Sequence, residues 1–493
     1  MAFELESAAH PENLKRVVIE PVTRVEGHGK VTLLLDEDNR VHQARFHIVE
    51  FRGFEKFIQG RPYWEVPVLV QRLCGICPVS HHLAASKAMD MIVGARLTPT
   101  AEKLRRLMHF GQILQSHALH FYYLASPDLL FGFDSDVARR NIVGVAAAYP
   151  EIARQGVALR RYGQEVIRIT AGKRVHGTGS IPGGVNKNLS MEERDTLLKE
   201  IDDMIAWSQG AVELVKKVYG GRPDFHNGFG YFRSSFMSLV REDGALDLYH
   251  GGLRARDEHG QTIFDHVDYT HYWDYIHEEV KPWSYMKFPF IRSKGREEGW
   301  YRVGPLARVN NCDLIPTPLA EAERKAFKAF GGGSALHATL AYHWARMIEM
   351  LHCVEGIKEL LHDPDLLGDD LVTQGQRAFR GVGVIEAPRG TLIHHYRVDE
   401  DDLIVRANLI VSTTHNNQAM NEAVRQVALQ YLDGQNLTEG LLNYIEVAIR
   451  AFDPCLSCAT HALGQMPLEV ELQDAAGQVV DRLARNGGGE TAR

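Results

Sequence analysis

Residues 72–81 read Arg-Leu-Cys-Gly-Ile-Cys-Pro-Val-Ser-His, and residues 453–461 read Asp-Pro-Cys-Leu-Ser-Cys-Ala-Thr-His. Each stretch holds a Cys-x-x-Cys pair followed by a histidine, and together they contain four of the six cysteines. Thiolates are soft donors that select zinc, copper(I), nickel-like centres and iron–sulfur clusters. If the pairs meet in space, the fold is built around one all-thiolate site drawn from both ends of the chain.

Both cysteine pairs lie beside residues that favour the start of a helix. Pro78 follows Cys77 and is suited to a first helical turn, and Asp453-Pro454 predicts an N-cap followed by a first-turn proline. The dipole and free N–H groups of a helix N-terminus stabilise a thiolate over a thiol. Since a metal binds the deprotonated form, both local settings suit metal ligation.

The spacing by itself leaves several metals open. A Cys₄ zinc site is the commonest use of two Cys-x-x-Cys pairs, and a [4Fe–4S] cluster is a second interpretation. Ligand pairs separated by almost the whole chain are unusual for compact zinc folds. The residues that flank the cysteines are therefore needed to choose among these metal sites.

Composition restricts the class of protein. The length of 493 residues suggests about three domains, but a site shared by both ends favours one body. The net charge of −8 gives no case for binding nucleic acid or anionic membrane. We find no apolar stretch of membrane-spanning length, and the acidic start Met1–Glu6 lacks a signal-peptide pattern. Few, clustered cysteines indicate a reducing compartment, so we expect a cytoplasmic protein. A chain that lacks a signal can still be exported with a partner that carries one.

The hydrophobic pattern predicts a mainly helical core with small sheets near both ends. Residues 16–50 alternate like a hairpin with a turn at Asp36–Asn39, and 381–411 have strand composition. Residues 223–315 are mixed, and we expect irregular peripheral structure there. A short hairpin is expected from Pro467, before the Gly-rich end at 486–489. Helical periods begin at Thr98 and recur at 150–170, 191–219, 335–362 and 416–452.

Taken with their flanking residues, the two cysteine stretches resemble the paired signature of the large subunit of [NiFe]-hydrogenases. The resemblance covers about residues 16–467, and it implies that family's large-subunit fold with a central bundle of long helices. A related respiratory complex I subunit lacks the cysteines, so all four argue for hydrogen chemistry. Further matching boxes are Arg24-Val25-Glu26-Gly27-His28, Arg52-Gly53-Phe54-Glu55, Ile181-Pro182-Gly183-Gly184, Glu386-Ala387-Pro388-Arg389-Gly390 and, less closely, Ser412-Thr413-Thr414-His415-Asn416-Asn417.

The resemblance implies a nickel–iron centre on the four cysteines. Cys74 and Cys455 would be terminal nickel ligands, while Cys77 and Cys458 would bridge nickel to an iron that also carries CO and cyanide. Glu26 would take the proton from the Cys455 thiolate. A carboxylate suits this relay if burial raises its pKa toward neutrality.

Other roles implied by the resemblance lie around that centre. Arg389 would hold its guanidinium over the metals, with Asp453 orienting it. Pro388 and Thr413 would line the cyanide pocket. His81 would hydrogen-bond a bridging thiolate, a role that orients the metal ligand. Glu55 and His461 would hold a structural Mg²⁺.

One position departs from the family pattern, and several residues have ordinary interpretations. Ser116 stands where many members place an aspartate near the active-site arginine, which should change the polarity around Arg389. We expect Cys312 and Cys353 to be buried thiols. The stretch 177–184 lacks G-x-G-x-x-G spacing and is not a dinucleotide loop. We expect ordinary core or surface roles for His117, His120, His394 and His395.

Electron transfer requires other chains. Two cysteines remain after the metal site, too few for an all-cysteine cubane cluster. The resemblance implies a small subunit with iron–sulfur clusters and diaphorase subunits that carry FMN and bind NAD. It also implies nickel and iron insertion factors and a maturation endopeptidase that cuts between His461 and Ala462. The chain would then comprise one catalytic domain, 1–461, and a removable extension, 462–493.

The resemblance therefore implies the catalytic subunit of a bidirectional, NAD⁺-linked hydrogenase that catalyses H₂ ⇌ 2H⁺ + 2e⁻. Two alternatives stay open. One is another hydrogenase branch, linked to NADP⁺ or a deazaflavin. The other is a non-catalytic scaffold with a Cys₄ zinc site.

Overall fold

The computed structural model describes residues 15–36, 38–460, 468–473, 479–485 and 491–492. Our expectations for the first residues, for His461 and Ala462, and for the stretch 486–489 lie outside these ranges. Across the described helices, none is both long enough and apolar enough to cross a membrane.

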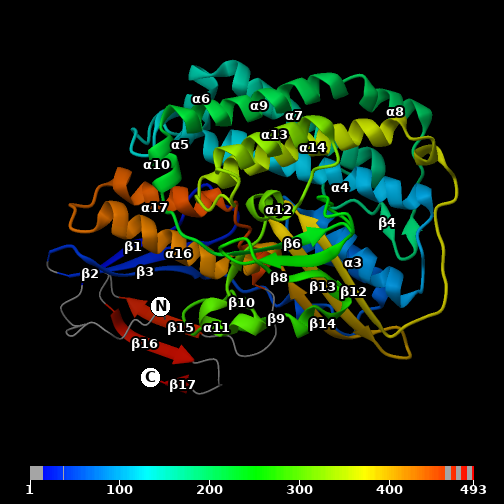
Figure 1. Ribbon diagram of the computed structural model, residues 1–493. Helices are drawn as coiled ribbons and strands as arrows, with labels where there is room; N and C mark the ends of the chain where they lie inside the picture. The colour runs from blue at the N-terminus through cyan, green and yellow to red at the C-terminus, as the bar shows by residue number, and fades with distance from the viewer. Residues whose placement is uncertain (1–14, 37, 461–467, 474–478, 486–490, 493) are drawn as a thin grey trace.

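Four long helices form one layer of the molecule (Figure 1). They confirm the expected helical periods and the central helix bundle. Helix α4 begins after Thr98, whose hydroxyl accepts a hydrogen bond from Ala101 N at 3.1 Å. Helix α4 packs on α7 and α14, and α14 packs on α9. The layer consists of α4 (Pro99–Leu119), α7 (Pro150–Ala171), α9 (Ile201–Gly221) and α14 (Ala341–His362), joined by α5 (Ser126–Phe131), α6 (Ile142–Ala148), α8 (Met191–Leu198), α10 (Pro223–Gly228) and α13 (Pro318–Phe330).

The N-terminal sheet has three antiparallel strands in the order β1-β2-β3. The predicted hairpin is confirmed for β2 and β3, and β1 adds an edge strand. Helix α16 packs on β3 and on α17, which leads into the second cysteine pair. These elements are β1 (Lys15–Ile19), β2 (Gly29–Leu35), β3 (Val41–Ile48), α16 (Asn417–Val427) and α17 (Glu439–Ala451).

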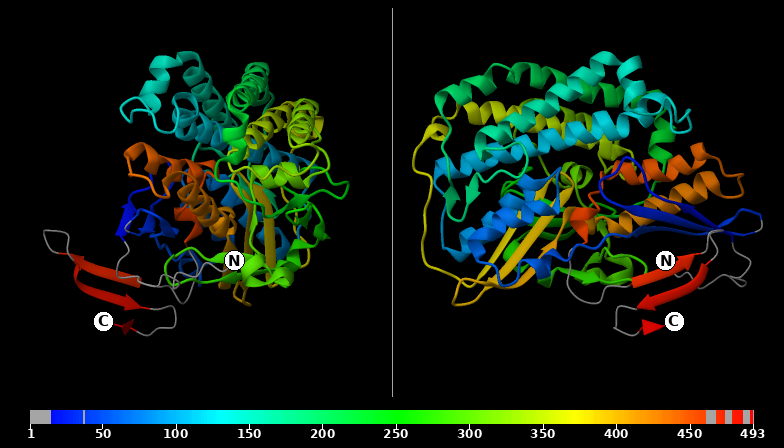
Figure 2. Two further views of the ribbon diagram at one scale, coloured as in Figure 1. Left: turned by 60° about the vertical axis from the view of Figure 1, so that its left-hand side comes forward. Right: turned by 180° about the vertical axis from the view of Figure 1, so that it is seen from behind.

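A second antiparallel sheet, β12-β13-β14, lies against helix α3, as both views in Figure 2 show. The strand composition of 381–411 is thereby confirmed. Gly381 and Gly383 allow the close approach, because a Cβ on either would collide with a carbonyl oxygen of α3. Helix α3, whose N-cap is Cys77, is thus fixed against this sheet. The elements are α3 (Pro78–Ile92), β12 (Arg380–Ala387), β13 (Gly390–Val398), β14 (Ile404–Ile410) and α15 (Ser412–His415).

Our expectation of irregular peripheral structure at 223–315 is wrong. This segment contributes a sheet with the order β11-β6-β7-β8, and every residue of β6 is buried. Helix α12 is buried along its whole length between that sheet and α14. The short strands carry serine, arginine and aspartate, which hid the strand pattern. The segment consists of β6 (Ser235–Val240), β7 (Gly252–Arg256), β8 (Thr262–Val267), β9 (Ile276–Glu279), β10 (Phe288–Ile291), α11 (Gly295–Glu298), β11 (Tyr301–Arg302) and α12 (Pro305–Asn311).

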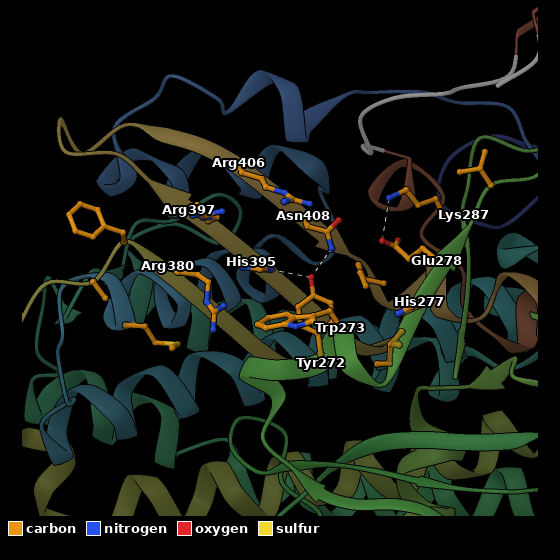
Figure 3. Close-up of a pocket in the computed structure, with 16 residues that line it drawn as sticks. Tyr272, Trp273, His277, Glu278, Lys287, Arg380, His395, Arg397, Arg406 and Asn408 are labelled. Carbon is orange, nitrogen blue, oxygen red and sulfur yellow. Dashed lines mark hydrogen bonds and ion pairs between the residues drawn. The ribbon is translucent and has the colours of Figure 1, made fainter. Parts of the chain in front are cut away.

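Three smaller features complete the fold. Strands β4 (Ser180–Ile181) and β5 (Gly184–Val185) form a short hairpin. The expected C-terminal hairpin is present as β15 (Leu468–Gln473) and β16 (Val479–Arg485), extended by β17 (Thr491–Ala492). A broad pocket opens between β12–β14 and the β9–β10 pair (Figure 3).

Candidate metal centre

The two Cys-x-x-Cys pairs meet in the core. The Sγ atoms of Cys74 and Cys455 are 3.3 Å apart, and those of Cys77 and Cys458 are 3.7 Å apart. All four Sγ atoms lie within 4.8 Å of one another, and all four residues are buried. The expected meeting of the two cysteine pairs in space is therefore confirmed.

The first pair is held by a helix start, as predicted. Cys77 is the N-cap of α3, and Pro78 occupies its first turn. The Cys74 sulfur accepts hydrogen bonds from the backbone N–H groups of Ile76 and Cys77, each at 3.2 Å. These donors and the helix dipole favour a thiolate at this end of the site.

The second pair is not held by a helix start, so our expectation for Asp453-Pro454 is wrong. Helix α17 ends at Ala451, and Asp453 follows it with a left-handed φ of 54°. Cys455 instead forms a parallel β-bridge with Glu26, and only a short 3₁₀ turn, Ser457–Ala459, follows. The Asp453 side chain does not cap a helix because it binds Arg389.

The donor set suits a soft metal cation. Despite burial, hydrogen bonds with the other three cysteines hold the pKa of Cys74 well below the thiol range. Burial raises the pKa of Cys455 and Cys458 well above that range. Burial thus opposes the thiolate form of Cys455 and Cys458, and a bound cation would offset that cost.

A closed void of about 10 Å³ adjoins the sulfurs. That volume is about one water-sized probe, so only a very small group fits in the void. Thr413 lines the void, and its oxygen accepts a hydrogen bond from Cys455 N at 3.0 Å. The hydroxyl proton of Thr413 is left to donate elsewhere. Pro388 and Arg389 line the same void.

Arg389 occupies a tight turn above the cysteines. Ala387 and Gly390 pair across β12 and β13, which makes Pro388 and Arg389 the two turn residues. Arg389 Nε donates to the Asp453 backbone oxygen at 2.6 Å, and Nη2 donates to Asp453 Oδ1 at 3.1 Å. Nη1 is buried with no hydrogen-bond partner among the described residues. Although burial opposes its charge, Asp453 and the cysteines raise the pKa of Arg389.

Glu26 links the N-terminal box to the second cysteine pair. Its Oε1 accepts a hydrogen bond from Ser457 Oγ at 2.5 Å, and its backbone oxygen accepts one from Leu456 N. Burial raises the pKa of Glu26, and the charge of Cys74 raises it further. Hydrogen bonds with Cys455 and Ser457 act in the opposite direction. A carboxyl group with a raised pKa beside a thiolate can receive a proton.

His81 is paired with His394, a contact that the sequence analysis did not predict. His81 Nδ1 is 3.1 Å from His394 Nε2, and His394 Nδ1 is 2.6 Å from the Tyr396 hydroxyl. All three side chains are buried, and His81 lines the void. His394 is a core histidine, as expected, but the sequence gave no sign of its hydrogen bonds with His81 and Tyr396, which depend on the packing of α3 against β13.

A buried ionic network beneath the void was also missed. Arg308 Nε and Nη2 each donate to Glu349 at 2.5 Å, and Arg308 Nη1 donates to Glu386 at 2.7 Å. His117 Nε2 lies 2.7 Å from Glu349. Ser116 is fully buried, and no hydrogen bond joins it to Arg389. Charged residues normally predict a surface, so the sequence pattern gave no signal for this network.

Only half of the expected Mg²⁺ site falls within the described residues. Glu55 is buried, and its Oε1 accepts a hydrogen bond from Leu409 N at 2.7 Å. Arg52 N donates to Thr460 O at 2.8 Å, which brings the residue before His461 beside the Arg52–Glu55 box.

Cys312 and Cys353 are buried thiols, as expected, and burial raises the pKa of both.

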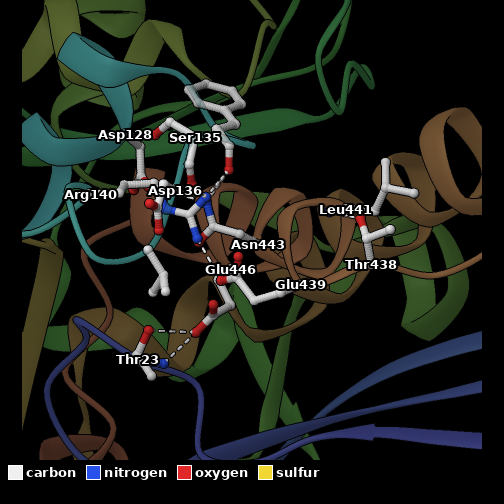
Figure 4. Close-up of polar contacts among 12 residues, drawn as sticks. Thr23, Asp128, Ser135, Asp136, Arg140, Thr438, Glu439, Leu441, Asn443 and Glu446 are labelled. Carbon is white, nitrogen blue, oxygen red and sulfur yellow. Dashed lines mark hydrogen bonds and ion pairs between the residues drawn. The ribbon is translucent and has the colours of Figure 1, made fainter.

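One buried carboxylate ties the N-terminal box to the helix before Cys455. Asp128, on α5, accepts hydrogen bonds from Arg24 at 2.6 Å and from Arg450 at 3.0 Å. Asn443 also donates to it, at 3.1 Å. The same junction holds Thr23, whose N–H and hydroxyl donate to Glu446 of α17 (Figure 4). Glu26 and Cys455 are thus positioned by a shared set of contacts.

We expect Asp128→Asn to lower the free energy of unfolding by about 3–5 kcal/mol, because it removes the buried carboxylate shared by Arg24 and Arg450 and leaves Arg450 with Glu446 alone. A urea titration of the assembled enzyme measures this as a lower midpoint. The control is Asp136→Asn, an exposed residue whose side chain accepts a hydrogen bond from Ala138 N in the same loop (Figure 4). Equal midpoints for the two variants would contradict the role of Asp128.

Comparisons with known proteins agree on one family. A model described as nickel-dependent hydrogenase matches residues 52–132 and 237–461, and one described as HoxL-like matches 16–51. The NAD-reducing hydrogenase HoxS subunit beta of Cupriavidus necator is 51% identical over 487 residues, covering 96% of this chain and 100% of that one. The sulfhydrogenase 2 subunit alpha of Pyrococcus furiosus is 28% identical over 453 residues, covering 90% and 98%. A solved NAD⁺-reducing [NiFe]-hydrogenase in the H₂-reduced state has a TM-score of 0.89 and 59% identity, covering 91% and 99%.

Proposed function

The chain belongs to the nickel-dependent hydrogenase family as a large subunit, and from this we propose that it catalyses H₂ ⇌ 2H⁺ + 2e⁻ at the four cysteines. The observation that carries the proposal is the cluster of four buried Sγ atoms, within 4.8 Å of one another and lined by Arg389. When bound, a nickel–iron centre supplies the Lewis acidity that makes H₂ acidic enough for heterolytic cleavage. Cys74, Cys77, Cys455 and Cys458 would hold it.

We assign proton transfer to Glu26. It hydrogen-bonds the Cys455 side chain, and its raised pKa suits a carboxyl group that takes a proton and passes it on. Ser457 Oγ holds the Glu26 carboxylate in place at 2.5 Å. The carboxylate therefore keeps one orientation while its protonation changes.

Residues around the void would hold the small ligands of a bound iron. Thr413 has a hydroxyl proton to donate after accepting from Cys455 N, which suits a cyanide nitrogen. Pro388 offers an apolar wall that suits CO. Arg389, oriented by Asp453, also lines the void. Its Nη1 has no hydrogen-bond partner among the described residues. His81, supported by His394, is assigned to a bridging thiolate.

We propose that Glu55 and His461 hold a structural Mg²⁺, a hard cation suited to oxygen ligands. The buried Glu55 carboxylate and the contact of Arg52 with Thr460 support this placement. The ion would then fasten the end of the catalytic domain to its N-terminal box.

Electrons are proposed to leave through an iron–sulfur small subunit to FMN-containing diaphorase subunits that reduce NAD⁺. The likeness to NAD-reducing enzymes supports this acceptor. Between the ligands Cys74 and Cys77, Gly75 is exposed and Ile76 is half-buried, so a partner can approach close to the metals. We place the complex in the cytoplasm.

We propose that nickel and iron insertion factors load the site and that an endopeptidase then cuts between His461 and Ala462. Intact mass measurement of active enzyme should show a chain that ends at His461. Chain from cells grown without nickel should keep residues 462–493. An active, nickel-loaded chain of full length would contradict this processing step.

The experiment that tests the function combines metal analysis with infrared spectroscopy of the purified complex. We expect nickel and iron in equal amounts and bands from metal-bound CO and cyanide. Zinc without these bands would support the scaffold alternative and overturn the proposal. Assays of H₂ oxidation with NAD⁺, NADP⁺ and a deazaflavin as acceptors decide among the hydrogenase branches.

A further inference from the structure

Three arginines form one row across the β12-β13-β14 sheet, far along the sequence from the cysteines. Arg380 pairs with Arg397 across β12 and β13, and Arg397 pairs with Arg406 across β13 and β14. Cross-strand partners project from the same face, and like charges directly opposite each other are destabilising. All three are exposed and line a pocket of about 1350 Å³, here called the arginine-row pocket (Figure 3).

The positive charge of this row is not neutralised by the described part of the chain. Among the described residues, no carboxylate forms an ion pair with any of the three arginines. The pocket's other cation, Lys287, is paired with Glu278 at 3.3 Å. An unneutralised row in a chain of net charge −8 indicates a site for an anion.

The floor of the pocket supplies a further donor. The Tyr272 hydroxyl accepts a hydrogen bond from Asn408 Nδ2 at 2.8 Å and lies 3.3 Å from His395 Nδ1, so it donates its proton there. Burial and the three arginines lower the pKa of His395 to about 4, which makes the ring neutral at neutral pH. A neutral ring that accepts at Nδ1 carries its proton on Nε2. His395 Nε2 is buried and has no partner among the described residues.

The extent of the row favours a diphosphate over a single small anion. A guanidinium fork binds phosphate oxygens in pairs. Neighbouring strands are about 4.8 Å apart, so the row extends over about 10 Å and can engage more than one phosphate. The pocket also exceeds the volume needed for phosphate alone, since ligand pockets of about 300–1,000 Å³ already hold drug-sized molecules. Ile276, Val280 and the half-exposed Phe379 give it apolar walls.

We propose that the arginine-row pocket binds an organic diphosphate, with a nucleoside diphosphate as the simplest example. The phosphates lie on Arg380, Arg397 and Arg406, with His395 Nε2 donating to an oxygen. The apolar body of the ligand packs against Ile276, Val280 and Phe379. This site is separate from the cysteine centre, since the two have no lining residue in common.

The test is calorimetric titration of the purified hetero-oligomeric enzyme with ADP. We expect Arg397→Gln with Arg406→Gln to weaken one class of ADP site by about 10- to 100-fold, the effect of losing hydrogen bonds to charged groups. His395→Phe should weaken the same class while keeping the charge. ADP sites on partner subunits contribute equally in every preparation, so the difference in ADP binding between wild type and variant measures this pocket.

The matched control is Arg154→Gln with Arg161→Gln, which removes the same two charges from α7, outside the pocket, where these arginines pair with Glu151 and Glu200. Its ADP binding should equal that of the wild type. Unchanged binding in the double variant, or an equal loss in the control, would overturn the proposal. Hydrogen exchange gives a further check. The proposal would also be overturned if a partner subunit protected the amides of residues 395–408 and the assembled enzyme had no ADP site there. Oxidation of H₂ with an artificial dye should be unaffected in all variants, so failure here leaves the proposed function standing.

Discussion

Glu26→Gln should reduce H₂ oxidation by about 10²–10⁴-fold, the range for loss of a positioned proton-transfer group. The amide keeps the size of the side chain and a hydrogen bond with Ser457, but it cannot take a proton from Cys455. The β-bridge between residue 26 and Cys455 is made by backbone atoms and should persist. We therefore expect nickel content and the infrared bands to match the wild type.

The matched control is Glu50→Gln. Glu50 lies beside Gly27, but its carboxylate pairs with His28, the more exposed residue. This variant should keep full turnover. If Glu26→Gln also kept full turnover, proton transfer would have to leave the site by another group.

Arg389→Lys should lower turnover by about 10²–10³-fold, comparable to removing one preorganised donor from an active site. Lysine keeps the positive charge but replaces the planar fork with a single ammonium group. It cannot bond the Asp453 backbone and carboxylate while also keeping a further N–H donor unpartnered in the wall of the void, as Arg389 does among the described residues. Steady-state H₂ oxidation measures the effect.

The comparison for this variant is Arg105→Lys. Arg105 is equally buried and binds Asp90 and the carbonyl of Gly184, away from the cysteines. Arg105→Lys should lower the free energy of unfolding more than it lowers the turnover rate per nickel-loaded site. A rate near that of the wild type for Arg389→Lys, at equal nickel content, would remove the arginine from the reaction.

Local patterns predicted much of the fold. The helical period from Thr98 marks α4, and Pro78 marks the start of α3, because both features depend on neighbours within one or two turns. The pattern failed at 223–315, where β6 is buried on both faces and its serines face other protein groups instead of water. It failed at Asp453 because a long-range contact with Arg389 replaced the helix cap.

The sequence by itself determined the chemistry available to this protein: four soft thiolates in two pairs, with the flanking boxes that identify the family. Only the tertiary structure decided how these groups act together. It places Cys455 against Glu26 and Thr413, buries Arg308 between Glu349 and Glu386, and aligns three arginines across one sheet. Such contacts join residues far apart in the chain, and burial sets the pKa of each group. Neither is contained in any local stretch of sequence.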